Sequence, residues 1–413
     1  MKKLDIAIAG AGPAGLAAAL FLHRAGHRVT VFERFDTPAP VGSGLILQPT
    51  GLTVLGVLGL LDQIMTLGSR IERLYGADAR SGRTVLDVRY DAQRGGRFGV
   101  AVHRAALFGV LHRAAIGENI AIETGIDLDQ VDVGDKVAPI TAEGRKVGSF
   151  DLVIDASGSR SKLRRFAFHS EEPRPLPYGA FWASLDWRGE GFEDNALLQR
   201  YERASVMIGV LPIGRPVLSS EKMAAFFWSL KPDEADRVRS EGLDAWKGRV
   251  RGLWPECGAY MDQIDSFDQL TLARYGDHTL KLPVGPRLAI IGDAAHSTSP
   301  QLGQGANMAM LDAAALAYNL ERAANVDEAL DAYARARRWH VRVFQALSSM
   351  FTPFYQSDSA MLPFIRDRLV AIAARIPPGP QFLASMVAGT AVDPFGAAGL
   401  KESDWSHVVA SQS

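Results

Sequence analysis

The chain has 413 residues and a formal net charge of -1 at pH 7, with 45 Lys and Arg against 46 Asp and Glu. At roughly 150 residues per domain this length predicts two or three domains. A hydrophobic content of 47% with 22% charged residues excludes a disordered chain. The near-neutral charge argues against nucleic acid as a partner. A single cysteine, Cys257, excludes an internal disulfide and a cysteine-rich metal site, and favours a cytoplasmic location.

Two uncharged stretches could be mistaken for membrane-directed segments. Residues 6–22 have the apolarity of a signal peptide, but Asp5 precedes them and glycines and a proline interrupt them. Residues 37–61 are long enough to cross a bilayer, yet contain three prolines and five glycines. We expect a loop, a short strand and a short helix there, and no stable membrane association.

The first residues predict a strand, a helix and a second, parallel strand, over 4–9, 14–25 and 27–33. Gly10, Gly12 and Gly15 lie in the turn between the first strand and the helix. There they would let the backbone approach a pyrophosphate that faces the helix N-terminus.

Glu33 closes the second strand, where its carboxylate could accept hydrogen bonds from both hydroxyls of a ribose. The pattern indicates a dinucleotide site but does not by itself separate NAD from FAD.

Further along the chain, 152–155 and 288–291 are short apolar strands followed by glycine-containing turns, and a helix pattern covers 305–320. Three such turns predict one parallel sheet assembled from distant segments. Between them, aromatic and β-branched runs at 178–187, 205–213 and 223–230 predict an antiparallel sheet.

We therefore expect an α/β protein with a Rossmann-like FAD-binding domain, an inserted, mainly antiparallel β-sheet substrate domain and a helical C-terminal segment. The composition turns helical from about 327, and prolines from Pro353 onward break the later part into short pieces. The predicted boundaries are 1–75, 98–170 and 275–345 for the FAD-binding domain, 76–97 and 171–274 for the substrate domain, and 346–413 for the C-terminal segment.

Residues 287–307, which run from RLAIIGDAAH through PQLGQGAN, resemble the second FAD-binding motif of the flavoprotein aromatic hydroxylases, the single-component monooxygenases related to para-hydroxybenzoate hydroxylase. The resemblance implies that Asp293 binds a ribityl hydroxyl and that Gly303 to Asn307 place backbone N–H groups under the flavin pyrimidine edge. A helix N-terminus there would stabilise the negative charge of reduced flavin.

The resemblance covers most of residues 1–345 and includes a middle motif over 151–164, in which Ser157 stands where the family has Asp. Because that motif is associated with FAD and NAD(P)H contacts, the substitution could weaken nicotinamide reduction, or Ser157 could simply accept a hydrogen bond in its turn. Arg104 looks like the family arginine that reaches the FAD diphosphate or ribityl region. The cofactor-binding residues expected from motif and resemblance are Gly10, Gly12, Pro13, Ala14, Gly15, Glu33, Arg34, Arg104, Asp293, Gly303, Gly305, Ala306 and Asn307.

The activity implied by the resemblance is that of a monooxygenase, in which NADH or NADPH reduces FAD, O2 adds at C4a, and the hydroperoxyflavin hydroxylates an aromatic or heteroaromatic small molecule. Side chains alone do not activate O2, and the nine histidines show no metal-ligand spacing. Two alternatives remain: a flavin-dependent halogenase or reductase of the same fold, although no halogenase Trp-x-Trp segment is present, and a flavin-binding protein with impaired NAD(P)H turnover.

Substrate contacts are expected from Phe181, Trp182 and Phe227 on the inserted strands, although each could instead belong to the sheet core, as could Tyr201, Phe226 and Trp228. Pro300 is a candidate wall of the active site, with a carbonyl free to face the substrate. No catalytic side chain is identified. His296 could act as a general base, but a structural role is favoured.

Two features of the C-terminal part remain. The charged run 335–340 predicts a solvated helix face. Apolar residues recur at near-helical spacing from Met361 to Ile372, and packing on the FAD domain is favoured there over a dimer surface or membrane attachment. The chain is expected to be a monomer or a homodimer.

Overall fold

The computed structural model describes residues 2–37, 42–370 and 374–410. Its first sheet has six strands in the order β19-β20-β11-β1-β2-β8. All neighbours are parallel except β19 and β20. The bounds are β1 Asp5–Ala9, β2 Arg28–Phe32, β8 Ala121–Glu123, β11 Leu152–Asp155, β19 Val284–Gly285 and β20 Leu288–Ile290. The parallel sheet predicted from distant segments is confirmed.

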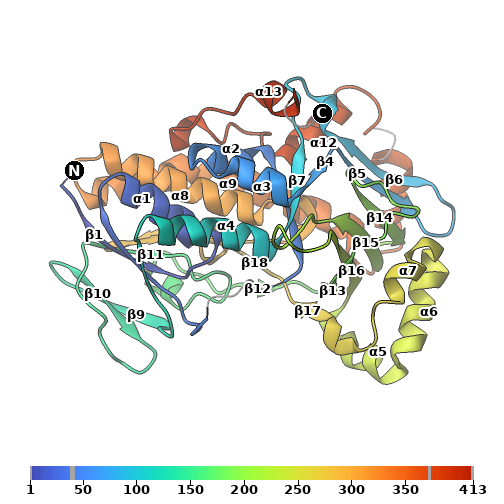
Figure 1. Ribbon diagram of the computed structural model, residues 1–413, viewed down its shortest axis with the longest axis horizontal. Coiled ribbons are helices and arrows are strands. Elements are labelled where there is room, and N and C mark those ends of the chain that lie inside the picture. The colour runs from blue at the N-terminus through green and yellow to red at the C-terminus, as the bar shows by residue number, and fades with distance from the viewer. Residues whose placement is uncertain (1, 38–41, 371–373, 411–413) are drawn as a thin grey trace.

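Helices pack on one another over one face of this sheet, and α8 contacts α1, α2 and α9 (Figure 1). They are α1 Pro13–Arg24, α2 Pro49–Val57, α3 Leu61–Leu67, α4 Arg104–Gly117, α8 Gly305–Arg322 and α9 Val326–Tyr355. The opposite face packs on the hairpin β9 Leu128–Val133 and β10 Val137–Thr141 and on the 3-10 turn η2 Leu163–Phe166. The loop, strand and helix expected over 37–61 are confirmed as β3 Gly44–Leu47 and α2, with 38–41 outside the described residues.

A second sheet has seven strands in the order β17-β13-β16-β15-β14-β5-β6 and is antiparallel except between β14 and β5. The bounds are β5 Arg73–Asp78, β6 Thr84–Arg89, β13 Gly179–Asp186, β14 Ala196–Glu202, β15 Val206–Pro212, β16 Met223–Leu230 and β17 Thr271–Ala273. The predicted antiparallel sheet is present, but β5 begins inside the range 1–75 that the sequence assigned to the first domain. The outer face of this seven-stranded sheet is covered by α5 Ala235–Glu241, α6 Leu243–Leu253 and α7 Gly258–Met261 (Figure 1).

Two small sheets lie between the large ones: β3 with β7 Gly99–His103 and β4 Ser69–Ile71, and β18 Gly276–Thr279 with β12 Arg174–Pro175 and β21 His296–Ser297. Hydrogen bonds from serine hydroxyl groups also join the loop before β3 to strand β13. Ser43 Oγ donates to the carbonyl of Ala183 at 3.1 Å, and Ser184 Oγ donates to Ser43 Oγ at 2.8 Å. The loop before β3 is therefore fixed against strand β13 of the seven-stranded sheet.

The C-terminal part forms short helices, as the prolines predict. They are α10 Met361–Ile365, a π-helical turn Arg366–Val370, α12 Gly379–Ala388, the turn η9 Gly396–Ala398 and α13 Trp405–Ala410. The expected apolar packing over 361–372 is wrong for Met361 and Phe364, which are 66% and 57% exposed. This stretch instead buries Pro363 and Arg366, which are three residues apart and so share one side of the helix. The side chains of Leu369, Val370 and Ile372 lie outside the described residues.

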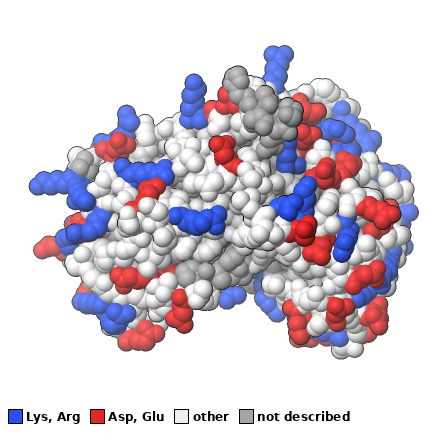
Figure 2. Space-filling view, viewed as in Figure 1, with Lys and Arg blue, Asp and Glu red and all other residues white. Residues whose placement is uncertain are grey.

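Acidic and basic side chains are interspersed over the face shown in Figure 2. Within the described ranges, no helix has the length and apolarity needed to span a membrane. The same residues contain no group of three or more His, Cys, Asp or Glu side chains placed to hold a metal ion.

Candidate flavin site

Three turns meet at one edge of the six-stranded sheet. In the strand register, Ala9 of β1 lies beside Asp155 of β11, and Asp155 lies beside Ile290 of β20. Because the three strands are parallel neighbours, the turns that follow them emerge side by side at their carboxyl ends, where ligands bind in open α/β sheets. The turns singled out by the sequence therefore form one site.

The glycine-rich turn is packed tightly on its inner side and is open on its outer side. Gly10 has φ +100°, and a Cβ there would lie 2.7 Å from the carbonyl oxygen of Ala156. A Cβ on Gly15 would lie 1.9 Å from the carbonyl oxygen of Gly10, whereas a Cβ on Gly12 would meet nothing within 4 Å. Gly12 is the N-cap of α1, and Pro13 and Ala14 open the helix. An open cradle at a helix N-terminus suits a pyrophosphate.

Glu33 is buried and accepts hydrogen bonds from the N–H groups of Ala11 at 2.8 Å and Phe35 at 3.2 Å. It therefore fixes the turn between β1 and α1, a role that the sequence did not predict. Each carboxylate oxygen keeps a second acceptor position, so the predicted ribose contact is compatible with this geometry. The neighbouring Arg34 is exposed, with its guanidinium 4.6 Å from the ring centre of Phe35.

Ser157 belongs to the turn after β11. Its hydroxyl donates to Asp155 Oδ1 at 2.5 Å, and its N–H donates to the same oxygen at 3.1 Å. Ser161 Oγ donates to Asp155 Oδ2. Burial raises the pKa of Asp155, against the lowering effect of these hydrogen bonds. The Ser157 hydroxyl is thus a donor within its turn rather than the predicted acceptor.

Asp293 lies on the turn η6 Gly292–Ala294, which follows β20. Within the described part of the chain, no donor makes a hydrogen bond to its accessible carboxylate, although Arg104 and Arg164 exert charge effects on it. Desolvation by the surrounding protein raises the pKa of Asp293. The charges of His296, Arg104 and Arg164 act in the opposite direction and lower it. A Cβ on Gly305 would lie 3.6 Å from Asp293 Oδ1. An accessible, unpartnered carboxylate beside a helix start fits a hydroxyl-bearing ligand such as a ribityl chain.

The start of α8 adjoins this carboxylate. Gly303 has φ +62°, and the first N–H groups of the helix have no partner within it. The Asn307 side chain is fully engaged, because its Oδ1 accepts the N–H of Gln48 at 2.8 Å and its Nδ2 donates to Ile46 and Gly303 carbonyls. Asn307 therefore ties β3 to the helix, and only the backbone of Gly305, Ala306 and Asn307 remains available to a ligand.

Arginine side chains flank the site. Arg104 opens α4, is exposed, and packs against Gly42, where a Cβ would lie 3.1 Å from its Nε. Arg164 was not singled out from the sequence. It is buried, and its Nε and Nη1 have no hydrogen-bond partner. The sequence signal that could have identified Arg164 is its position at the end of the middle motif over 151–164.

The predicted substrate residues divide between the two faces of the seven-stranded sheet, because side chains alternate along a strand. Trp182, Tyr201 and Phe227 lie on the inner face, where the rings of Trp182 and Phe227 are 4.7 Å apart. Phe181 is fully buried on the outer face against the α5–α7 side, and Phe226 and Trp228 join it there. The prediction for Phe181 is wrong.

Tyr275, which no sequence signal identified, accepts a hydrogen bond from Trp182 Nε1 at 2.8 Å. Burial raises its pKa to about 12, and the charge of Arg104 acts against this increase. The charge of Arg104 therefore acts on both Tyr275 and Asp293. Pro300 opens the turn η7 Pro300–Leu302 and is exposed, but its carbonyl accepts the Gly303 N–H at 3.0 Å. This turn therefore occupies one acceptor position of the Pro300 carbonyl and leaves a second, so the predicted contact with the substrate stays a prediction.

His296 is buried, with Nε2 2.6 Å from Asp312 Oδ2, as the structural interpretation expects. The prediction of a solvated face over 335–340 is wrong for Arg337 and His340, which are buried. Arg337 Nε donates to Asp312 Oδ1 at 2.7 Å, and its Nη2 lies 3.2 Å from His340 Nδ1. The other side of α9 carries Arg335, Arg338 and Trp339 of the same run, and these three side chains are exposed.

The comparisons with known proteins agree with this geometry. The family model described as FAD binding domain matches residues 3–346. The FAD-dependent urate hydroxylase of Mycolicibacterium vanbaalenii is 27% identical, covering 81% of this chain and 84% of the relative. The 3-amino-4-hydroxybenzoate 2-monooxygenase of Streptomyces cremeus is 29% identical, covering 76% and 78%.

A crystal structure of Klebsiella pneumoniae HpxO complexed with FAD and uric acid superposes with a TM-score of 0.79 at 22% identity, over 94% of this chain and 96% of that one. At that identity the likeness concerns the fold. The chain therefore belongs to the FAD binding domain family, and it is an FAD-dependent monooxygenase.

Proposed function

We propose that this FAD-dependent monooxygenase uses NADH or NADPH and O2 to hydroxylate an aromatic or heteroaromatic small molecule at the inner face of the seven-stranded sheet. When bound, FAD supplies the oxygen chemistry that side chains lack. The observation that carries the proposal is the accessible, unpartnered carboxylate of Asp293 beside the start of α8. The charge of Arg104 acts on this carboxylate and on Tyr275, which accepts the hydrogen bond of Trp182.

The protein residues have separate tasks in this proposal. The open cradle at Gly12 and the start of α1 hold the pyrophosphate, Glu33 the ribose, and Asp293 the ribityl chain. Arg104 and Arg164 add positive charge. The 76–97 and 171–274 segments, with β5 from Arg73, form the substrate domain, and Trp182 and Phe227 place an aromatic ring and exclude water from it.

A two-part experiment tests the proposal. The purified protein is expected to be yellow, with one non-covalent FAD per chain. Under anaerobic conditions, NADH and NADPH are then compared for the rate at which they bleach the flavin absorbance. Each is tried with a panel of probes that includes urate, 3-amino-4-hydroxybenzoate and 3-hydroxypyridine carboxylates.

The expected result is a probe that accelerates bleaching and, after air is admitted, a product heavier by one oxygen atom. A halogenated product would indicate the halogenase alternative. A flavin that no nicotinamide reduces, with any probe, would favour the binding protein with impaired turnover. Either result would overturn the proposal.

A further inference from the structure

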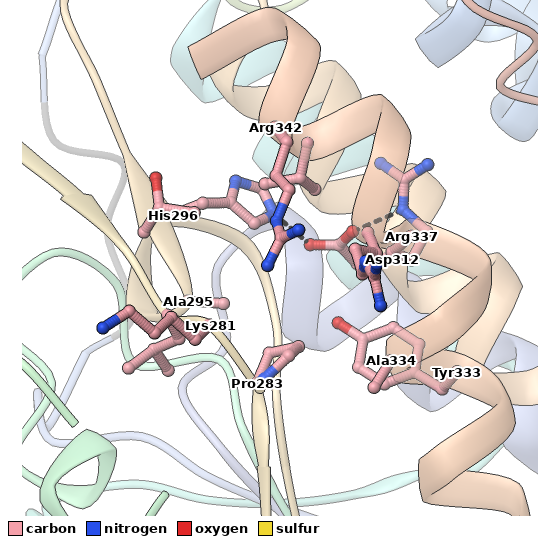
Figure 3. Close-up of a pocket in the computed structure, with 13 residues that line it drawn as sticks. Lys281, Pro283, Ala295, His296, Asp312, Tyr333, Ala334, Arg337 and Arg342 are labelled. Carbon is pink, nitrogen blue, oxygen red and sulfur yellow. Dashed lines mark hydrogen bonds and ion pairs between the residues drawn. The ribbon is translucent and has the colours of Figure 1, made fainter. Parts of the chain in front are cut away.

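A single buried carboxylate stands behind the turn that carries Asp293. Asp312 lies on α8 and is fully buried. Its Oδ2 accepts the N–H of Gly292 at 2.9 Å and lies 2.6 Å from His296 Nε2, while its Oδ1 accepts from Arg337 Nε at 2.7 Å. Figure 3 shows His296 and Arg337 converging on it from opposite sides. Two of these partners bracket Asp293 in the chain.

The turn itself has little freedom to adopt another shape. Gly292 has φ +61°, and a Cβ there would lie 3.0 Å from the Cβ of Ala309 on α8 and 3.3 Å from that of Ala14 on α1. The strand before it is held by Tyr333 of α9, whose hydroxyl donates to the Ile290 carbonyl at 3.0 Å. The N–H of Gly292 and the ring of His296 are therefore the points at which α8 sets the direction of the Asp293 peptide.

The partners of Asp312 favour its charged, deprotonated form. Burial alone would raise its pKa, but His296 and Arg337, with their hydrogen bonds, hold the pKa well below the usual range of a carboxyl group. The network continues from Arg337 to His340, whose Nε2 lies 3.0 Å from the carbonyl oxygen of Gly389, at the end of α12. The cavity beside it, near Lys281 and Arg342, is about 20 Å³, room for one water and for no organic ligand.

We infer that Asp312 is a positioning residue, which sets FAD affinity by fixing the η6 turn so that the Asp293 carboxylate faces the flavin site. The inference rests on the proposed role of Asp293 and adds a residue that touches neither FAD nor substrate. A residue that acts through another must lose its effect when that other is removed, and a double-mutant cycle measures this loss.

The experiment measures the dissociation constant of FAD from apoprotein, with melting temperature recorded for each variant. Asp312→Asn places an amide N–H₂ against the donors of Gly292, His296 or Arg337, so FAD should bind at least about tenfold more weakly. The matched control is Arg337→Met, which breaks the same buried pair from α9 but leaves Asp312 with Gly292 and His296. It should lower the melting temperature and change the FAD dissociation constant less than about twofold.

In an Asp293→Ala background, Asp312→Asn should weaken FAD binding by less than a further twofold. Independent, multiplicative losses would overturn the inference and leave the role of Asp293 intact. So would an Asp312→Asn variant with lowered melting temperature and unaltered FAD affinity. If Asp293→Ala alone left FAD affinity unaltered, the ribityl assignment would fail, and this inference would fail with it.

Discussion

The carboxylate of Asp155 accepts two hydrogen bonds from one residue, the hydroxyl of Ser157 at 2.5 Å and its backbone N–H at 3.1 Å. The serine therefore supplies a donor to a buried acid, and an aspartate in its place would bring a second carboxylate against the first. Local pairing therefore gives Ser157 a structural role in the altered middle motif.

Ser157→Asp should accordingly destabilise the fold by about 1–3 kcal/mol at neutral pH. The adjacent charges would raise a carboxyl pKa in the folded state above its unfolded value, in addition to the upward shift that burial already gives Asp155. Protonation then favours the folded state, so the loss should be small near pH 4 and grow as pH rises toward neutrality. Urea unfolding at several pH values measures this. Ser157→Ala, which removes only a hydrogen bond, should show a deficit with little pH dependence.

The same pair of variants tests the alternative prediction that Ser157 weakens flavin reduction by nicotinamide. If the aspartate accelerated anaerobic flavin reduction by NADH or NADPH, the pairing explanation would be wrong. We expect the rate of reduction to be unaltered or slower.

Two glycines of the first turn offer a matched test of the pyrophosphate cradle. Gly12→Ala adds a methyl group to open space, so the apoprotein should keep its melting temperature while FAD binding weakens at least about tenfold. Gly15→Ala places a Cβ 1.9 Å from the Gly10 carbonyl oxygen and should lower both the melting temperature and the affinity for FAD. Thermal unfolding and FAD titration of the two apoproteins decide the matter. Normal FAD affinity in Gly12→Ala would place the pyrophosphate elsewhere.

The sequence predicted the parts of this fold that depend on periodicity and turn chemistry. The strand, turn and helix patterns at Gly10, Asp155 and Gly292 were sufficient, because adjacent parallel strands bring such turns together. It failed where partners come from distant segments. No local pattern reveals that Arg337 is buried against Asp312, since a charged run on an amphipathic helix predicts solvent.

The prediction for Phe181 failed for a related reason. Phe181 and Trp182 are neighbours with similar composition, and alternation places them on opposite faces of the sheet. Which face turns toward the flavin depends on the packing of α5–α7 on the other one. Tyr275 was missed because a single tyrosine between short strands carries no signature of its hydrogen bond to Trp182.

This division between faces predicts a contrast between neighbours. Trp182→Phe removes the donor to Tyr275 and opens space beside Phe227, so the KM for the stimulating aromatic probe should rise several-fold. Phe181→Leu should lower the free energy of unfolding by about 1 kcal/mol and leave KM unaltered, because it faces the α5–α7 side. Steady-state kinetics with urea unfolding compares them. Equal effects on KM would contradict the assignment of faces.

The final prediction concerns the connection between α12 and the flavin helix. Gln304, just before α8, donates from Nε2 to the Val387 carbonyl at 2.6 Å. Gly389 has φ +81°, and a Cβ there would lie 2.8 Å from Thr50 Oγ1 and 2.9 Å from Gln304 Oε1. Gly389→Ala should therefore combine the cost of a left-handed alanine, about 1 kcal/mol, with displacement of Gln304 and weaker FAD binding.

Gly26→Ala is the matched control for this variant. Gly26 has φ +90°, but a Cβ there would meet nothing within 4 Å, so only the backbone cost applies. Measured together, the two variants separate strain from contact: we expect Gly26→Ala to lose about 1 kcal/mol with normal FAD affinity, and Gly389→Ala to lose more of both. If the two lost the same stability and both kept full FAD affinity, α12 would have no influence on the start of α8. The C-terminal segment would then pack on this region without affecting FAD binding, although its Val387 carbonyl accepts a hydrogen bond from Gln304.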